Sequence, residues 1–229
     1  MEVLSVAFVD FTRAFDEVRL EKLKEKLRKA GVEEGLIRWV EASLEKVRAR
    51  VKGTSMWYPE DKGLKQGGPS GPSLYSVYTH DLPEEVGKRR GQRRQTDRQR
   101  PKVPAGENGR WVDFLAPLFA DDTTLLESSD RQLNLLLSNL VAFAEPLRLL
   151  FSDKSRFVRF GRIASREKEE VRLGEIVMKE AREQPYLGLV LSANCNLETM
   201  MEARSIKAER CMQGLMGKIG REGGRDSTR

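Results

Sequence analysis

Blocks of apolar and polar residues along the chain predict a mixture of strands and helices. Residues 3–11 are mostly β-branched or apolar, a pattern typical of a buried strand. From Phe15 onward, apolar residues recur at helical spacing, which predicts a helix that stops at Gly31. The same spacing predicts a second helix over 33–47, and a strand and turn are expected to follow at 48–58.

The second half of the chain continues this mixture. Residues 63–72 are rich in Gly and Pro and predict a loop, and a short helix is expected at 74–81. Two strands, 112–119 and 123–126, are expected to form a hairpin, and leucine spacing predicts a helix over 132–143. Later elements are expected as strands at 155–160, 176–178 and 186–191 and as an amphipathic helix at 197–216. Because strands and helices do not alternate regularly, we expect an α+β fold.

The composition excludes several classes of protein. The chain has 229 residues, with 41 Lys or Arg, 35 Asp or Glu, and 39% hydrophobic residues, which fits a globular protein with a polar surface. Its most apolar stretch, 133–151, is broken by polar residues, so no membrane partner is expected, and the first ten residues do not resemble a secretory signal. Two cysteines and one histidine are too few for a disulfide scaffold or a multi-histidine metal site. Carboxylates therefore remain as the candidate chemistry.

Basic residues are concentrated in residues 87–110, which hold nine Lys or Arg against two acidic residues, a net charge of +7. The segment has few large apolar residues, so we expect a disordered, exposed loop. A solvated linker, a nucleic-acid contact and a nuclear import signal all remain open for it. An intracellular protein is expected, and the nucleus is compatible with this insert. The arginines of the candidate nucleic-acid contact are Arg89, Arg90, Arg93 and Arg94.

Three aspartates stand at strand ends. Asp10 follows an apolar run, and Asp121 and Asp122 lie side by side at the expected hairpin tip. A carboxylate beside buried residues requires solvent or a cation, and clustered carboxylates suit Mg²⁺ or Mn²⁺. Taken alone, an Asp-Asp pair is also common in ordinary turns.

Five segments resemble, in order, the motifs of reverse transcriptases. Residues 8–18 resemble motif A, 63–75 motif B and 119–122 motif C. Residues 151–155 resemble motif D, and 186–188 resemble motif E. One motif alone is a weak signal, but five in this order are a strong one. The Phe-Asp pair of motif A and the Asp-Leu-Pro sequence after motif B are similar to those of non-LTR retrotransposon enzymes.

The resemblance implies a polymerase palm, an antiparallel sheet packed on helices, with partial fingers and the start of a thumb. Residues 1–195 would form the palm with fingers-side helices, including the basic insert, and 196–229 a thumb-like helix with a polar tail. The implied reaction is RNA-directed DNA synthesis on an RNA template, a DNA primer and dNTP, with two Mg²⁺ or Mn²⁺ ions. By resemblance, Asp10 and Asp121 bridge the two ions and Asp122 supports the site.

The resemblance also implies a nucleotide-binding pocket. Phe15 would exclude a ribose 2′-hydroxyl, Gln66 and Gly67 would line the nucleotide and template pocket, and Lys154 would approach the triphosphate. The alternatives are a core role for Phe15 and an ordinary surface role for Lys154.

Two other functions remain open. A Gly at position 71, where the motif usually has Ser, favours a catalytically inactive palm that binds nucleic acid or protein. The expected lack of fingers strands favours it too, because the family would place those strands before residue 1. A metal-dependent nuclease would also use clustered carboxylates, but its chemistry does not require the Gln66-Gly67 loop or Phe15.

Overall fold

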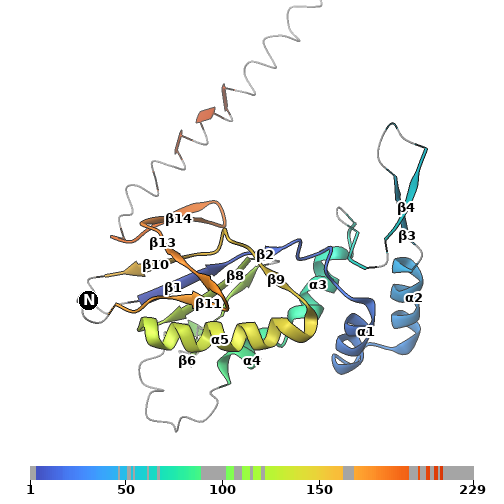
Figure 1. Cartoon of the computed structure of the whole chain (residues 1–229), viewed down its shortest axis with the longest axis horizontal. Helices are drawn as coiled ribbons and strands as arrows, with labels where there is room; N and C mark the ends of the chain where they lie inside the picture. The colour runs from blue at the N-terminus through green and yellow to red at the C-terminus, as the bar shows by residue number, and fades with distance from the viewer. Residues whose placement is uncertain are drawn as a thin grey trace, which may run out of the picture.

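The computed structural model describes most of the chain (Figure 1). The described residues are 4–45, 47–50, 53, 55–60, 62–65, 68–88, 102–105, 110–113, 116–119, 122–161, 168–195, 201, 205–206, 209–210 and 212–213.

A five-stranded sheet with the strand order β13-β10-β1-β8-β7 forms the centre of the fold. Its strands are β1 (Leu4–Val9), β7 (Leu118–Phe119), β8 (Asp122–Glu127), β10 (Arg156–Phe160) and β13 (Lys179–Glu180). β1 lies in the middle and pairs antiparallel with β8 and β10, whereas β13 pairs parallel with β10. The strand expected from the first apolar run is therefore the central strand of the sheet.

β1 is apolar along most of its length because both of its faces are covered. Ala7 and Val9 belong to the main core, whereas Val6 and Phe8 belong to a smaller apolar cluster. The helix α5 (Asp130–Leu147) lies along the sheet on the main-core side (Figure 1). Its leucines are spaced so that one face of the helix is fully buried against the sheet.

The helix expected at 132–143 is longer than the leucine spacing predicts. Ser129 caps its start by accepting a hydrogen bond from the Gln132 amide at 3.3 Å. Pro146 lies in the last turn and does not stop the helix there. The helix ends where Arg148 takes a left-handed backbone conformation with φ of 54°.

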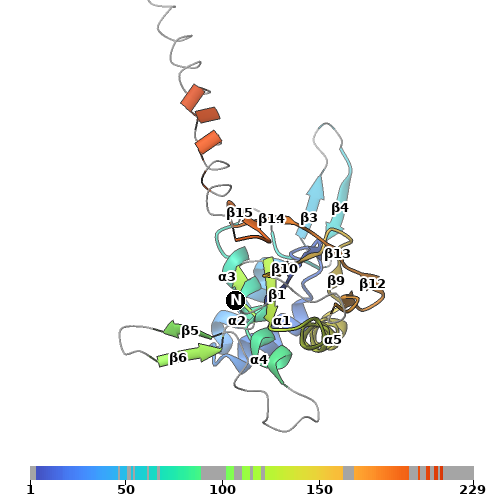
Figure 2. The ribbon, with the colours of Figure 1, turned by 90° about the vertical axis from the view of Figure 1, so that its left-hand side faces the viewer.

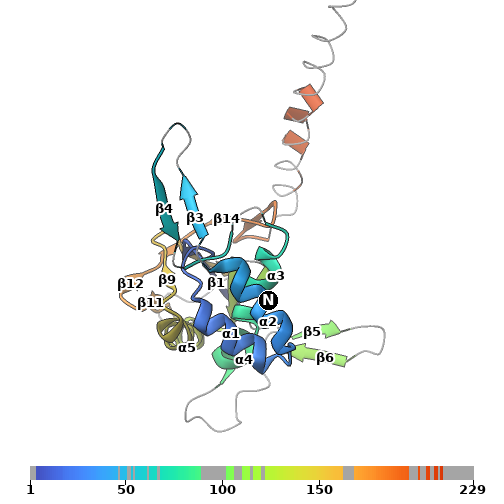
Figure 3. The same cartoon turned by 90° about the vertical axis from the view of Figure 1, so that its right-hand side faces the viewer.

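Three more helices, α1 (Leu20–Lys29), α2 (Glu34–Leu44) and α3 (Gly71–Thr79), pack at the end of the sheet to which β1 points (Figure 3). The helix α4 (Leu82–Gly87) lies against α5, where Asn139 donates a hydrogen bond to the Val86 carbonyl at 2.9 Å. An ion pair of 2.5 Å between Lys26 and Asp81 joins α1 to the corner between α3 and α4. α1 begins five residues later than Phe15, since residues 13–17 form a turn instead.

Within the described residues, five two-stranded sheets surround this body. They pair β2 (Phe11–Thr12) with β9 (Leu150–Phe151), β3 (Val47–Arg50) with β4 (Trp57–Glu60), β5 (Lys102–Ala105) with β6 (Arg110–Asp113), β11 (Arg172–Leu173) with β12 (Ile176–Val177), and β14 (Glu183–Tyr186) with β15 (Leu189–Ser192).

The single strand expected at 186–191 is wrong, because the chain reverses direction in its middle. Tyr186 pairs with Leu189, and the two residues between them have positive φ, 47° at Leu187 and 80° at Gly188. Two successive positive φ values are typical of the tight turns whose twist suits a hairpin. The segment is thus the tip of the β14–β15 hairpin.

The expectation of a loop throughout 87–110 is also wrong in part. α4 extends to Gly87, and residues 102–105 form β5, which pairs with β6 in a hairpin (Figure 2). Backbone pairing can order such a segment although it has few large apolar side chains. Residues 89–101 and 106–109 lie outside the described residues.

The single strand expected at 112–119 is instead parts of two strands. Residues 112 and 113 end β6, and residues 118 and 119 form β7. Pro117, which cannot donate to a sheet, lies just before β7, and its carbonyl accepts a hydrogen bond from the Thr124 amide at 3.1 Å. Phe119 then pairs with Asp122, so the hairpin expected around the adjacent aspartates is confirmed.

Near the C-terminus, the described residues of the expected helix at 197–216 are helical. Among the helices that the structure describes, none is both long and apolar enough to cross a membrane.

Candidate active site

One cavity brings together three of the residues singled out from the sequence. Asp10, Asp122 and Lys154 all line a cavity of about 270 Å³ at the end of β1. Val9 pairs with Thr123, so Asp10 and Asp122 occupy the next positions on two neighbouring antiparallel strands. Opposed positions on such strands carry their side chains on the same face. The central pairing of the sheet therefore brings the two carboxylates to one site.

Hydrogen bonds tie the turn that carries Lys154 to the backbone of Asp10. The Asp10 amide donates to Ser155 Oγ at 3.1 Å, and the Asp10 carbonyl accepts from the Ser152 amide at 2.8 Å. The Lys154 amide donates to Ser152 Oγ at 3.1 Å, which shapes the turn itself. Ser155 is buried, so water does not compete for its hydroxyl. The position of Lys154 is thus coupled to that of Asp10.

The cavity combines two carboxylates with one ammonium group. Carboxylate oxygens are the ligands that Mg²⁺ and Mn²⁺ prefer, so Asp10 and Asp122 fit a divalent cation. Lys154 is exposed and offers a positive charge to an anion in the same cavity. Within the described part of the chain, no group of three His, Cys, Asp or Glu residues could hold a metal ion. Asp121, the third predicted carboxylate, lies outside that part.

The tip of β14 forms another wall of the cavity, through Gln184, Pro185 and Tyr186. Tyr186 packs edge-on against Phe8 of β1, with ring centroids 5.5 Å apart. Sequence reasoning did not identify Gln184 or Ser155 as site residues. Ser155 could have been found from its place between the motif D lysine and a strand, whereas nothing local in the sequence marks Gln184.

Phe15 lies in the turn after β2 and does not line this cavity. It is half-buried and stacks on Tyr75 of α3, with ring centroids 4.7 Å apart and an angle of 24° between the rings. The stack fixes the Phe15 ring between the turn and α3. It also joins the segment that resembles motif A to the one that resembles motif B.

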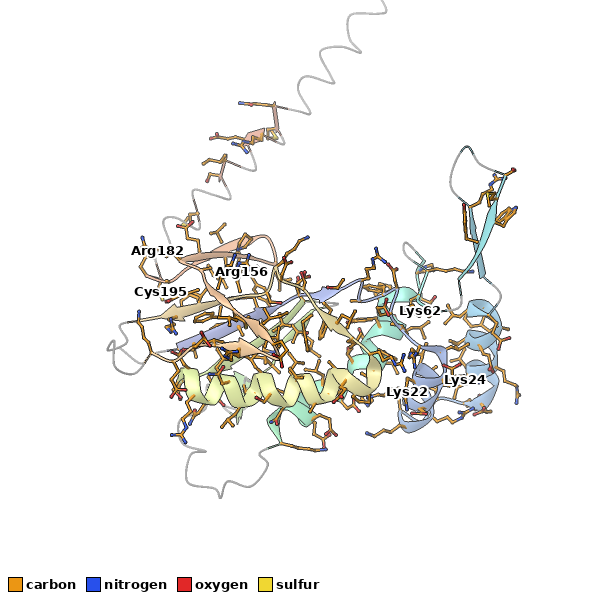
Figure 4. The ribbon with its side chains drawn as sticks, in the orientation of Figure 1. Lys22, Lys24, Lys62, Arg156, Arg182 and Cys195 are labelled. Carbon is orange, nitrogen blue, oxygen red and sulfur yellow. The ribbon has the colours of Figure 1, made fainter. Side chains whose placement is uncertain are left out.

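Residues 62–65, where the loop of motif B begins, are held against the same turn. The Gly63 amide donates to the Val18 carbonyl at 2.8 Å, and the Leu64 amide donates to the Phe15 carbonyl at 2.9 Å. Gly63 has φ of +98°, and a Cβ there would lie 3.0 Å from backbone atoms of Asp16, so only glycine fits without strain. Lys62, labelled in Figure 4, reaches Glu17 at 2.5 Å.

Several predicted site residues lie outside the described residues. They are Gln66 and Gly67, Asp121, and the basic residues Arg89, Arg90, Arg93 and Arg94. Their roles stay predictions.

A buried ionic network joins β1 and β10 to the start of α5. Asp130, at the start of α5, accepts hydrogen bonds from Ser5 of β1 at 2.7 Å and from the Glu169 amide at 3.0 Å. Arg159 of β10 pairs with the same carboxylate at 2.9 Å. Burial alone would raise the pKa of Asp130, but the hydrogen bonds from Arg159, Ser5 and the Glu169 amide outweigh it and lower that pKa.

Comparisons with known proteins identify the family and the fold. A family model described as "Reverse transcriptase (RNA-dependent DNA polymerase)" matches residues 2–191. Among solved structures, the chain is similar to apo telomerase from Candida tropicalis truncated from its C-terminal domain, with a TM-score of 0.54 and 13% sequence identity. The match covers 84% of this chain and 34% of the telomerase chain, so the chain spans about a third of that protein. A search of curated proteins gives no match. The similar fold confirms the α+β polymerase palm expected from the sequence.

Proposed function

The chain belongs to the reverse transcriptase (RNA-dependent DNA polymerase) family, and from this premise we propose that it catalyses DNA synthesis on an RNA template. The proposed step joins the 3′-oxygen of a DNA primer to the α-phosphorus of a dNTP and breaks the bond from that phosphorus to pyrophosphate. The observation that carries the proposal is the cavity shared by Asp10, Asp122 and Lys154.

Asp10 and Asp122 would hold two Mg²⁺ or Mn²⁺ ions together with Asp121, which connects β7 to β8. When bound, such ions would activate the attacking hydroxyl and stabilise the negative charge on the phosphate. The support from the chain itself is that two hard oxygen donors reach one cavity from neighbouring strands. In the absence of cations these carboxylates would repel each other and the triphosphate.

We propose that Lys154 binds the triphosphate and gives a proton to the leaving pyrophosphate. An ammonium group on an exposed turn keeps its three donors available, and the cavity puts it with the carboxylates. The hydrogen bonds of Ser155 and Ser152 to Asp10 would keep this lysine at a fixed distance from the reacting phosphate.

For the nucleotide pocket, the proposal assigns Phe15 to exclusion of the ribose 2′-hydroxyl, and Gln66 and Gly67 to contacts with the nucleotide and template. The support for this role is limited to the stack of Phe15 on Tyr75, which restricts movement of the ring as a steric gate requires; the ring itself lies outside the cavity of Asp10 and Asp122.

We further propose that the protein is of the non-LTR retrotransposon type and acts in the nucleus. Support comes from the motif resemblance and from the basic insert, whose arginines would contact nucleic acid through its phosphates.

Primer extension tests the proposed function. The full chain is incubated with a DNA primer on an RNA template, dNTPs and Mg²⁺, beside Asp10→Asn and Asp122→Asn variants. Asp153→Asn is the matched control, because Asp153 lies on the same turn as Lys154 and does not line the cavity. We expect the two cavity variants to lose at least about 100-fold in rate, as loss of a group that stabilises charge in a transition state commonly does. Extension that is equal in all four proteins, or absent in all four, contradicts the proposal.

A further inference from the structure

We propose that the β3–β4 hairpin binds single-stranded nucleic acid by stacking bases on its exposed aromatic side chains. This inference deepens the proposed function, on which it rests for the class of ligand. It adds a contact outside the cavity of Asp10 and Asp122.

The hairpin exposes large apolar side chains that a two-stranded sheet cannot bury. Relative exposure is 57% for Trp57, 45% for Tyr58 and 62% for Met56. These residues do not belong to either apolar cluster of the described residues. Trp57 and Tyr58 are successive residues of β4, so they lie on opposite faces of the hairpin, and each face exposes an aromatic ring. Exposed apolar groups that a fold leaves on its surface can mark an interaction site.

Charge favours a polyanion as the occupant. Arg50 pairs with Trp57 across the hairpin, and its guanidinium carbon lies 5.2 Å from the centroid of the Trp57 ring. Among the described residues of the distal part of the hairpin, 50, 53 and 55–58, Arg50 is basic and none is acidic. A cation beside an exposed aromatic ring is the combination that contacts a phosphate and a base of the same strand.

The position of the hairpin fits a strand that approaches the cavity. In Figures 1, 2 and 3 the β3–β4 hairpin projects away from α5, on the side where the β14–β15 hairpin lies. β14 forms one wall of the cavity that holds Asp10 and Asp122. A single strand that extends from the cavity on this side would meet the β3–β4 hairpin.

The chain offers a matched control for exposed tryptophan. Trp39 of α2 is 61% exposed, close to the value for Trp57, and forms no cation–π pair among the described residues. If exposed aromatic area alone were sufficient, Trp39 and Trp57 would contribute equally. If stacking beside a cation matters, only Trp57 contributes.

The test is binding of a fluorescently labelled 20-nucleotide oligo(dT) to the full chain by fluorescence anisotropy in EDTA, where no polymerisation occurs. We expect Trp57→Ala to weaken binding at least about fivefold, the lower limit for loss of one stacked base, and Trp39→Ala less than twofold. Arg50→Gln should reduce the slope of log affinity against log salt by about 0.7, the loss of one phosphate contact.

Thermal melting of each variant separates lost binding from lost folding, and Trp57→Phe keeps a stacking ring and should retain most of the affinity. Equal binding by wild type and Trp57→Ala overturns the proposal, and so does equal weakening by Trp39→Ala and Trp57→Ala. Primer extension by the wild-type chain would still report separately on the proposed function.

Discussion

Replacing Asp130 with Asn should destabilise the fold strongly, because the carboxylate is 1% exposed and accepts bonds from three other segments. Removing one partner of a buried ion pair costs about 3–5 kcal/mol, since the other charge remains buried. Arg159 would keep Glu180 at 2.5 Å and the Glu169 carbonyl at 2.8 Å, which favours the lower end of that range. We expect a loss of about 3 kcal/mol in the free energy of unfolding.

Urea denaturation followed by circular dichroism measures this loss. At this chain length, a change of about 3 kcal/mol corresponds to a fall in Tm of roughly 6–12 °C. Glu170→Gln is the control, because Glu170 pairs with Arg172 at the surface, where both side chains are more than half exposed. Surface pairs contribute about 0–1 kcal/mol. An Asp130→Asn variant that loses no more stability than Glu170→Gln would refute the reasoning.

The same residue predicts how stability depends on pH. The pKa of Asp130 is lower in the folded chain than in the unfolded chain, where it is about 3.9. Its stabilising contribution is therefore present above about pH 4 and is lost as the pH falls through the lower, folded value. The wild-type chain should lose stability faster than Asp130→Asn on acidification below about pH 4. Parallel curves for the two proteins would contradict this assignment.

Three further predictions follow from the turn and the loop beside the site. Gly63→Ala should lower the free energy of unfolding by at least about 2 kcal/mol, because a Cβ there would lie 3.0 Å from the backbone of Asp16. Gly53 also has a positive φ but has open space around it, so Gly53→Ala should lower that free energy by only about 1–2 kcal/mol. Equal losses for the two variants in urea denaturation would contradict the contact argument. Phe15→Val should raise incorporation of ribonucleotides relative to deoxyribonucleotides, and an unchanged ratio would leave Phe15 as a core residue. Ser155→Ala removes the acceptor for the Asp10 amide and should slow primer extension about tenfold, a prediction that an unchanged rate contradicts.

Elements whose secondary structure follows from the pattern of apolar residues within the element itself could be predicted from the sequence. β1 and α5 are clear examples, because a continuous apolar run and leucines at helical spacing each allow one way to bury the apolar residues. The hairpin between β7 and β8 follows in the same way from two short strands around a turn.

Elements that depend on distant contacts were predicted incorrectly. Residues 13–17 have apolar spacing that continues the helix, yet they form a turn. The Leu64 amide binds the Phe15 carbonyl and the Gly63 amide binds the Val18 carbonyl, contacts that come from a distant part of the sequence. The turn at Leu187 was missed because leucine rarely takes a positive φ, so only Gly188 indicated a reversal.

For the candidate site, motif order led to the residues that share the cavity, Asp10, Asp122 and Lys154. It did not lead to Ser155 or Gln184, whose contributions depend on how β9, β10 and β14 pack around the end of β1. Nor could it show that Phe15 stacks on Tyr75, a residue of a different motif.

The central claim, that Asp10 and Asp122 serve one cation site, is tested most directly by a double-mutant cycle on Mn²⁺ affinity. Mn²⁺ binding to the full chain is measured by electron paramagnetic resonance for wild type, Asp10→Asn, Asp122→Asn and the double variant. If both carboxylates hold the same ions, each single change weakens binding and the second change adds much less than it does alone. Independent, additive losses, or affinities that do not change in either single variant, would contradict a shared site.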